Sequence, residues 1–166
     1  MAVRPVLTLP NPVLSTSAAP VGTVDDDAVA LARDLVDTMQ ASPACVGLAA
    51  PQIGVSRRAF AVDVTGHRKA RSCHGLFVLF DPVILERSGP ESAREGCMSV
   101  PDLTGDVTRA AHLTIAGVTP EGQRLELEVD AFEARAVQHE LDHLDGLLFL
   151  DRVPGPHSIF PRKVYR

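Results

Sequence analysis

The segment from Gln138 to His143 constrains the fold more than any other, because it contains the pattern His-Glu-x-x-His. On a helix, residues four apart point in nearly the same direction, so His139 and His143 can bind one metal ion. Glu140 lies beside them, where a carboxylate can take a proton from water that a metal activates. The pattern therefore predicts a metal-binding helix and indicates a reaction class, the attack of water on a carbonyl carbon.

The same segment predicts that this helix is partly buried. Its apolar residues are Ala136, Val137, Leu141 and Leu144. Asp130 is a suitable N-cap with Glu133 at the spacing of a capping box, and Gly146 suits the position just past the C-terminal end. We expect a helix over about residues 131–145.

A catalytic metal usually has three protein ligands, so a third donor is needed. Phe149 stands where metzincin proteases have their third His, and no Glu follows Glu140 to complete a thermolysin-like site. The donors that remain downstream are Asp145, Asp151 and His157. Upstream, Cys97 is the best candidate, because the adjacent Gly96 lets the backbone approach a ligand closely.

A further segment, Cys45 to Gly54, has small residues, no charge and the neutral side-chain donor Gln52. This composition is needed where a backbone approaches a ligand, but it also fits a packed loop that follows a helix. Both interpretations stay open on the segment alone.

Taken together, three segments resemble the peptide deformylase family. They are Gly47–Gln52, Glu95–Ser99 and Gln138–His143, and their order and spacing also fit. The resemblance extends from about residue 6 to about residue 152. It implies an enzyme that removes the formyl group from the N-terminal formylmethionine of newly made polypeptides and releases formate.

The resemblance also implies roles for individual residues. The expected metal ligands are Cys97, His139 and His143. Ligand chemistry alone favours zinc, whereas the resemblance implies Fe²⁺, which Zn²⁺, Ni²⁺ or Co²⁺ can replace. Glu140 is expected to be the general base, and the Gln52 side-chain amide and the Met98 backbone N–H are expected to stabilise the oxyanion.

Substrate contacts are expected on two sides of the metal. Phe132, Arg135 and Ala136 precede His139 by seven, four and three residues, so they lie on its helix face and are expected to line a pocket for a methionine side chain. Without the resemblance, Phe132 and Ala136 fit an ordinary core equally well. Separate from these, Val46 and Gly47 are expected to offer backbone groups to an extended peptide.

Two positions depart from the family pattern. Cys45 stands where the first motif usually has Gly, and Met98 stands where Leu is usual, a swap that conserves volume. If position 45 required a positive φ, a Cβ there would cost about 1 kcal/mol or more. We favour a negative φ, with the Cys45 side chain only narrowing the edge of the cleft.

Composition limits the remaining possibilities. A chain of 166 residues with 45% apolar residues is expected to form a single globular domain, here a catalytic domain spanning 1–166. A net charge of −5 argues against a nucleic-acid surface. No apolar run has membrane-spanning length and no signal-peptide core is present, so a cytoplasmic enzyme is predicted. The resemblance to peptide deformylases implies formylmethionyl nascent chains, and with them the ribosome, as its partners.

The predicted fold class is α+β, with antiparallel strands packed around a central C-terminal metal-binding helix and an additional N-terminal helix. Apolar residues at helical spacing place the N-terminal helix between Val24 and Met39. Strands are expected at 58–64, 76–80, 83–86, 112–117 and 124–129, with a hairpin turn at 119–122. Prolines make the tail, 153–166, non-helical. Its Arg162, Lys163 and Arg166 are expected at a solvated end.

Two rival functions remain at this point. One is a metallopeptidase of another family. The other is a non-catalytic homologue that binds metal or formyl peptides without turnover. The presence of both Glu140 and Gln52 argues against a non-catalytic protein, since binding alone needs neither.

Overall fold

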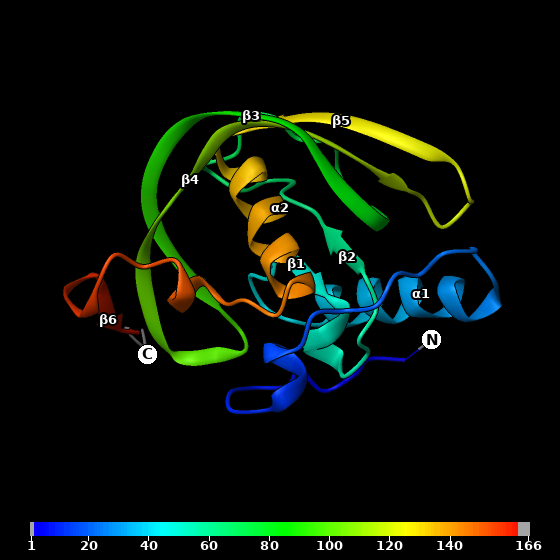
Figure 1. The fold of residues 1–166 in the computed structure, drawn as a ribbon, viewed down its shortest axis with the longest axis horizontal. Coiled ribbons are helices and arrows are strands. Elements are labelled where there is room, and N and C mark those ends of the chain that lie inside the picture. Colours follow the sequence, from blue (N-terminus) through cyan, green and yellow to red (C-terminus); the bar gives the residue numbers. More distant parts are fainter. Residues whose placement is uncertain (1, 163–166) are drawn as a thin grey trace.

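Two long, paired antiparallel strands curve around a central helix (Figure 1). They are β3 (Phe77–Cys97) and β4 (Val100–Val118), and the helix is α2 (Ala131–Leu144). The computed structural model describes residues 2–162. The pairing of β3 with β4 shifts register between Phe80 and Val83 and again at Ile84 to Glu86. Such irregularities bend a strand pair, which allows this pair to wrap around α2.

Among the described residues, four shorter strands complete the sheet, and all of them pair antiparallel. They are β1 (Gly47–Ala49), β2 (Ala59–Val62), β5 (Arg124–Asp130) and β6 (Ile159–Pro161). The order is β1-β2-β3-β4-β5, and β6 pairs with residues 103–105 of β4. Strand β1 therefore lies at an edge of the sheet. Short 3₁₀ helices cover Pro12–Ser15, Ala50–Ile53, Phe149–Asp151 and Pro156–Ser158.

The N-terminal helix α1 (Asp26–Gln40) has clear local causes. The Asp25 side chain accepts a hydrogen bond from the Ala28 N–H at 2.9 Å, and two acidic residues in the first turn suit the helix dipole. One face of the helix is buried and packs on β1 and β2.

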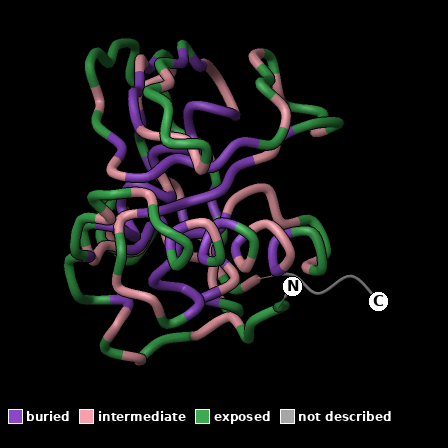
Figure 2. The backbone as a smooth tube through the Cα atoms, turned by 90° about the vertical axis from the view of Figure 1, so that its right-hand side faces the viewer, coloured by how far each residue is buried: buried purple, intermediate pink, exposed green. Residues whose placement is uncertain are grey.

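Strand β2 separates two layers of core, because successive side chains of a strand point to opposite faces. Phe60 and Val62 belong to the core against α2, whereas Ala59 and Ala61 belong to the core against α1. Figure 2 shows the buried segments gathered in the middle of the molecule. The two helices thus cover opposite faces of the short strands.

The predicted α+β class is confirmed, as are both helices and the hairpin turn, where the Gly122 N–H donates to the Thr119 carbonyl at 2.8 Å. Helix α2 ends as expected, with Gly146 at φ 76°. The predicted capping box is wrong. Glu133 is fully buried and accepts from the His74 N–H at 2.8 Å, and Asp130 accepts from the Ser72 N–H at 2.9 Å.

The strands predicted at 76–80 and 83–86 are one strand, and it continues to Cys97. The prediction missed this because residues 86–92 are exposed and carry no apolar side chain except Pro90, so they lack the alternation that marks a half-buried strand. The described part of the tail is non-helical apart from a 3₁₀ turn, as predicted, and ends in β6. Lys163 and Arg166 lie outside the described residues. Within residues 2–162, no helix is long and apolar enough to cross a membrane.

Leu35 and Arg33 give a matched test of the α1 layer, because they lie on one helix but differ in burial. Leu35→Ala removes a fully buried side chain and is expected to lower the free energy of unfolding by about 2–5 kcal/mol. Arg33→Ala, on the exposed face, is expected to change it by less than about 0.5 kcal/mol. Urea denaturation measures both, and equal effects would contradict the proposed packing of α1.

Candidate metal centre and active site

Cys97, at the end of β3, meets His139 and His143 of α2 with ligand atoms all within 4.8 Å of one another. The Cys97 Sγ lies 3.4 Å from Nε2 of His143. His139 Nδ1 is engaged at 2.8 Å by Glu95, which leaves its Nε2 for the shared centre. Burial lowers the pKa of His143 well below its usual value, so this ring is neutral, as a metal ligand must be. One thiolate and two imidazoles form a donor set that suits Zn²⁺ or Fe²⁺.

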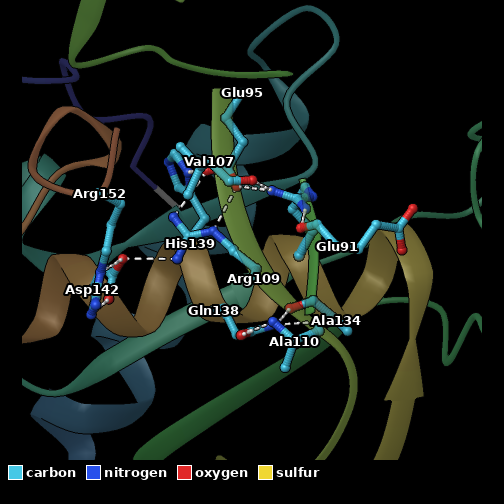
Figure 3. A network of polar contacts seen from close by, with 11 residues as sticks. Glu91, Glu95, Val107, Arg109, Ala110, Ala134, Gln138, His139, Asp142 and Arg152 are labelled. Atoms are coloured by element: carbon cyan, nitrogen blue, oxygen red, sulfur yellow. Dashed lines mark hydrogen bonds and ion pairs between the residues drawn. The ribbon is translucent and has the colours of Figure 1, made fainter. Parts of the chain in front are cut away.

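Glu95 anchors a buried network of charges behind His139 (Figure 3). Its carboxylate accepts from Arg109 at 2.6 and 2.9 Å and from Arg135 at 2.7 Å. Arg109 also donates to Asp142 at 2.8 Å. Burial alone would raise the pKa of Glu95, but the hydrogen bonds from His139 and Arg109 outweigh it and hold this pKa at about 2. An ionised Glu95 fixes the tautomer and orientation of His139.

Glu140 is buried beside Gly47 of β1, and the two segments fit only because residue 47 has no side chain. A Cβ at position 47 would lie 2.6 Å from Oε2 of Glu140. The other carboxylate oxygen, Oε1, has no hydrogen-bond partner within residues 2–162. Burial raises the pKa of Glu140 to about 7. The carboxylate is therefore positioned at the centre and free to exchange a proton there.

The Gln52 amide has a fixed orientation. Its Oε1 accepts from the Ala49 N–H at 3.0 Å, so Nε2 is the end that points to Ser99 Oγ at 3.1 Å and to Cys97 Sγ at 3.6 Å. Gln52 is 2% exposed. A donor held in this way needs no rearrangement to bind a developing negative charge.

A cleft of about 320 Å³ opens onto these groups. The predicted site residues that line it are Val46, Gly47, Gln52, Cys97, Met98, Phe132, Arg135, Ala136, His139 and Glu140. His143, 1% exposed, lies behind them. Residues from three segments that are distant in the sequence thus line one cleft.

The structure refines two of these positions. The Arg135 guanidinium donates to Glu95 and, at 2.7 Å, to the Glu91 carbonyl, so only its aliphatic stem is left to face the cleft. The Val46 carbonyl accepts from the Asp63 N–H at 2.9 Å. Because bonds alternate along an antiparallel strand, the backbone groups of Gly47 face the free edge of β1.

The expected negative φ at Cys45 is confirmed, since the residue with a positive φ in this segment is Ala44, at 56°. The Cys45 Sγ lies 3.2 Å from the Gly47 carbonyl. Burial raises the pKa of the Cys45 thiol to about 11, so the thiol stays protonated and donates this hydrogen bond.

Other sequence-based candidates have different places. His157 is exposed on the 3₁₀ turn before β6, and Asp145 pairs with Arg58 at 3.0 Å. Asp151 accepts from the Leu148 N–H at 2.8 Å. The expectation that Arg162 is at a solvated end is wrong, because Arg162 lines the cleft. Its place could not be predicted, since β6 reaches the cleft only by pairing with a strand more than fifty residues earlier.

Substitution of the two rival third ligands tests the metal centre. Cys97→Ala is expected to abolish stoichiometric metal binding, because it leaves two imidazoles and an open thiolate position. His157→Ala is expected to bind metal as the unmodified protein does. Elemental analysis of the purified proteins measures this, and the reverse result would overturn the proposed centre.

Known proteins that resemble this chain in sequence and in structure are deformylases. The family model described as "Polypeptide deformylase" matches residues 3–158. Peptide deformylase 1 of Bacillus subtilis is 44% identical over 153 residues, which cover 92% of this chain and 91% of that one. The crystal structure of a peptide deformylase from Legionella pneumophila superposes with a TM-score of 0.85 at 36% identity, covering 94% of this chain and 88% of that chain.

A class I type b peptide deformylase from Acinetobacter baumannii, solved with Met-Ala-Ser bound, has a TM-score of 0.83 at 35% identity, covering 92% of this chain and 100% of that chain. These matches span nearly all of the chain and agree in sequence and in structure. The resemblance carried by the three motifs is thereby confirmed, and the chain belongs to the polypeptide deformylase family.

Proposed function

We propose that this protein, as one catalytic domain, hydrolyses the formyl amide of N-terminal formylmethionine and releases formate and a free amino terminus. The observation that carries the proposal is the meeting of Cys97, His139 and His143 with Glu140 and Gln52 in one cleft. Each of these side chains has a chemical use in amide hydrolysis. Together they come from three segments that are distant in the sequence.

Cys97, His139 and His143 would hold the divalent metal that the family implies. A bound metal supplies Lewis acidity, which lowers the pKa of water and polarises a carbonyl. We propose Fe²⁺ as the resident ion, with Zn²⁺, Ni²⁺ and Co²⁺ as substitutes. The anionic Glu95 behind His139 increases the basicity of that ligand and holds it in place.

Glu140 is the proposed general base and later the general acid. It takes a proton from the attacking water, whose oxygen bonds to the formyl carbon, and returns a proton to the amine nitrogen as the carbon–nitrogen bond breaks. The Gln52 Nε2 and the Met98 backbone N–H are the proposed donors to the oxyanion. Gln52 is preorganised for this role because the Ala49 N–H holds the other end of its amide.

The proposed substrate contacts follow from the lining of the cleft. Phe132, Ala136 and the stem of Arg135 form an apolar recess beside His139, which suits an unbranched methionine side chain. Phe132 is held in place by a parallel stack on His67, with ring centroids 3.8 Å apart. Val46 and Gly47 contribute the strand edge along which an extended peptide can pair, chiefly through the outward backbone groups of Gly47. The Met-Ala-Ser bound by the relative from Acinetobacter baumannii also begins with Met.

Two assays separate this function from its rivals. We expect protein that is purified without oxygen and loaded with Fe²⁺ to release formate from formyl-Met-Ala-Ser. Cleavage of an internal bond in an acetylated peptide would instead indicate a metallopeptidase, and metal binding without release of formate would indicate a non-catalytic homologue. Nascent chains in the cytoplasm, presented at the ribosome, are the proposed physiological substrates.

Glu140→Gln is the sharpest test of the proposed base. The variant is nearly isosteric and leaves the three ligands intact, so metal content should be unchanged. Turnover should fall by at least about a hundredfold, the scale of losing general base catalysis. Formate release and elemental analysis measure the two quantities, and a rate within tenfold of the unmodified enzyme would exclude Glu140 as the base.

Gly47→Ala tests the close approach of β1 to Glu140. The added Cβ would lie 2.6 Å from the carboxylate, so Glu140 must move and the rate of formate release should fall by about tenfold or more. Cys45→Gly is the control two residues away. Because Cys45 has no positive φ that glycine would relieve, the Cys45→Gly enzyme should release formate at a rate only modestly changed. Its free energy of unfolding should change by less than about 1 kcal/mol. Equal rates for the Gly47→Ala and unmodified enzymes would show that the contact is unimportant.

A further inference from the structure

The C-terminal strand brings a cation to the rim of the cleft. Strand β6 pairs with residues 103–105 of β4, close to the hairpin end that carries Cys97 and Met98. The next residue, Arg162, is fixed by its N–H, which donates to the Asp102 carbonyl at 2.9 Å. Its guanidinium donates to the Cys97 carbonyl at 3.3 Å and lies against Gly96, where a Cβ would collide with it. The position of this guanidinium is therefore set by the fold.

Arg162 differs from Arg94 and Arg135, the other arginines that line the cleft, in having no carboxylate partner within residues 2–162. Glu95 already accepts hydrogen bonds from Arg109, Arg135 and His139, and Glu140 is buried beside Gly47. Arg94, also on the rim, pairs with Asp106 at 2.8 Å and lies over the Phe160 ring at 3.7 Å. Arg162 thus has guanidinium N–H groups that pair with no carboxylate, and it lies where a peptide bound in the cleft would pass.

We propose that Arg162 is a specificity-determining residue that binds a carboxylate on the substrate, downstream of formylmethionine. The inference rests on the proposed function. The cleft has two walls, residues 43–47 and residues 94–98, and Arg162 covers the second of these. A peptide extended between the walls brings its residues after methionine within reach of the guanidinium, whose fork geometry matches a carboxylate.

Two sources can supply this carboxylate, an acidic side chain or the free C-terminus of a short peptide. The full-length, metal-loaded enzyme is assayed with formyl-Met-Glu-Ala-amide and formyl-Met-Ala-Glu-amide against their Gln counterparts. Formyl-Met-Ala-Ser is assayed as the free acid and as the amide. At least one carboxylate peptide should exceed its neutral counterpart in kcat/KM by roughly threefold to tenfold, mainly through KM. The excess should shrink as salt is added, because an exposed pair is screened.

Variants of Arg162 identify the group that binds the carboxylate. For each variant we take the ratio of kcat/KM for a carboxylate peptide to kcat/KM for its neutral counterpart, so that differences in folded fraction between variants cancel. Arg162→Gln should bring the ratio close to one, Arg162→Lys should keep part of it, and Arg162→Glu should invert it. Arg94→Gln is the matched control, because Arg94 lines the same cleft but is already paired. It should keep the ratio, as should Arg124→Gln on the distant β4–β5 hairpin.

The outcomes also separate this inference from the proposed function. A ratio near one in the unmodified enzyme, or an unchanged ratio in Arg162→Gln, would overturn the inference and show that Arg162 only fastens the tail to Cys97. Formate release from neutral peptides would then still support the function. Failure of the unmodified enzyme to deformylate any of these peptides would overturn both.

Discussion

The Glu95 carboxylate is the interaction on which the rest of the site depends. It is 7% exposed, and an ionised group so far from water is stable only when its oxygens are fully bonded. Arg109 of β4 and Arg135 and His139 of α2 supply those bonds, so one side chain of β3 links both long strands to the metal helix (Figure 3). Removing Arg109 or Arg135 would take one cation from this buried carboxylate and leave it less well compensated, which destabilises the fold. The site and the fold are therefore held by the same contacts.

This arrangement explains why the metal centre can lie on a helix that contacts the sheet through small and aliphatic side chains. Apolar packing alone fixes the position of α2 only loosely along its axis, because aliphatic surfaces have no directional bonds. The charged network adds directional hydrogen bonds to this packing. Asp142, one turn beyond Gln138 on α2, accepts hydrogen bonds from Arg109 and Arg152, which come from two other segments. The ligands on α2 are thereby held in a fixed orientation, as a catalytic centre requires.

The sequence predicts the parts of this structure that depend on local pattern. Helix α2, its metal-binding face and its end at Gly146 follow from spacing over a few residues, and the motifs give Cys97 and Gln52. Contacts between distant segments leave no such pattern. Arg109 is a cation in an alternating strand, and nothing near it shows that it bonds to Glu95. Glu133 has the spacing of a capping box, but its carboxylate is hydrogen-bonded to the loop at residues 72–74 instead. A buried carboxylate is stabilised more by several hydrogen-bond donors than by the single backbone N–H that a cap provides.

The two walls of the cleft are held by different contacts, and this suits their different tasks. Residues 94–98 end a long strand that is paired along its length and tied to α2 by charge, as befits the wall that carries the metal ligand. The opposite wall contains β1, three residues long and at the edge of the sheet. A short edge strand offers little to an unwanted partner strand, which limits aggregation. It nevertheless keeps the backbone N–H of Gly47 on the free edge, while the Gly47 carbonyl accepts from the Cys45 thiol at 3.2 Å. In the proposed function, a peptide whose methionine fills the recess beside His139 would gain enough additional contact to pair there. Under the proposed function, selectivity at this edge would come from combining a weak strand pairing with a side-chain pocket, since a three-residue edge strand offers few backbone bonds by itself.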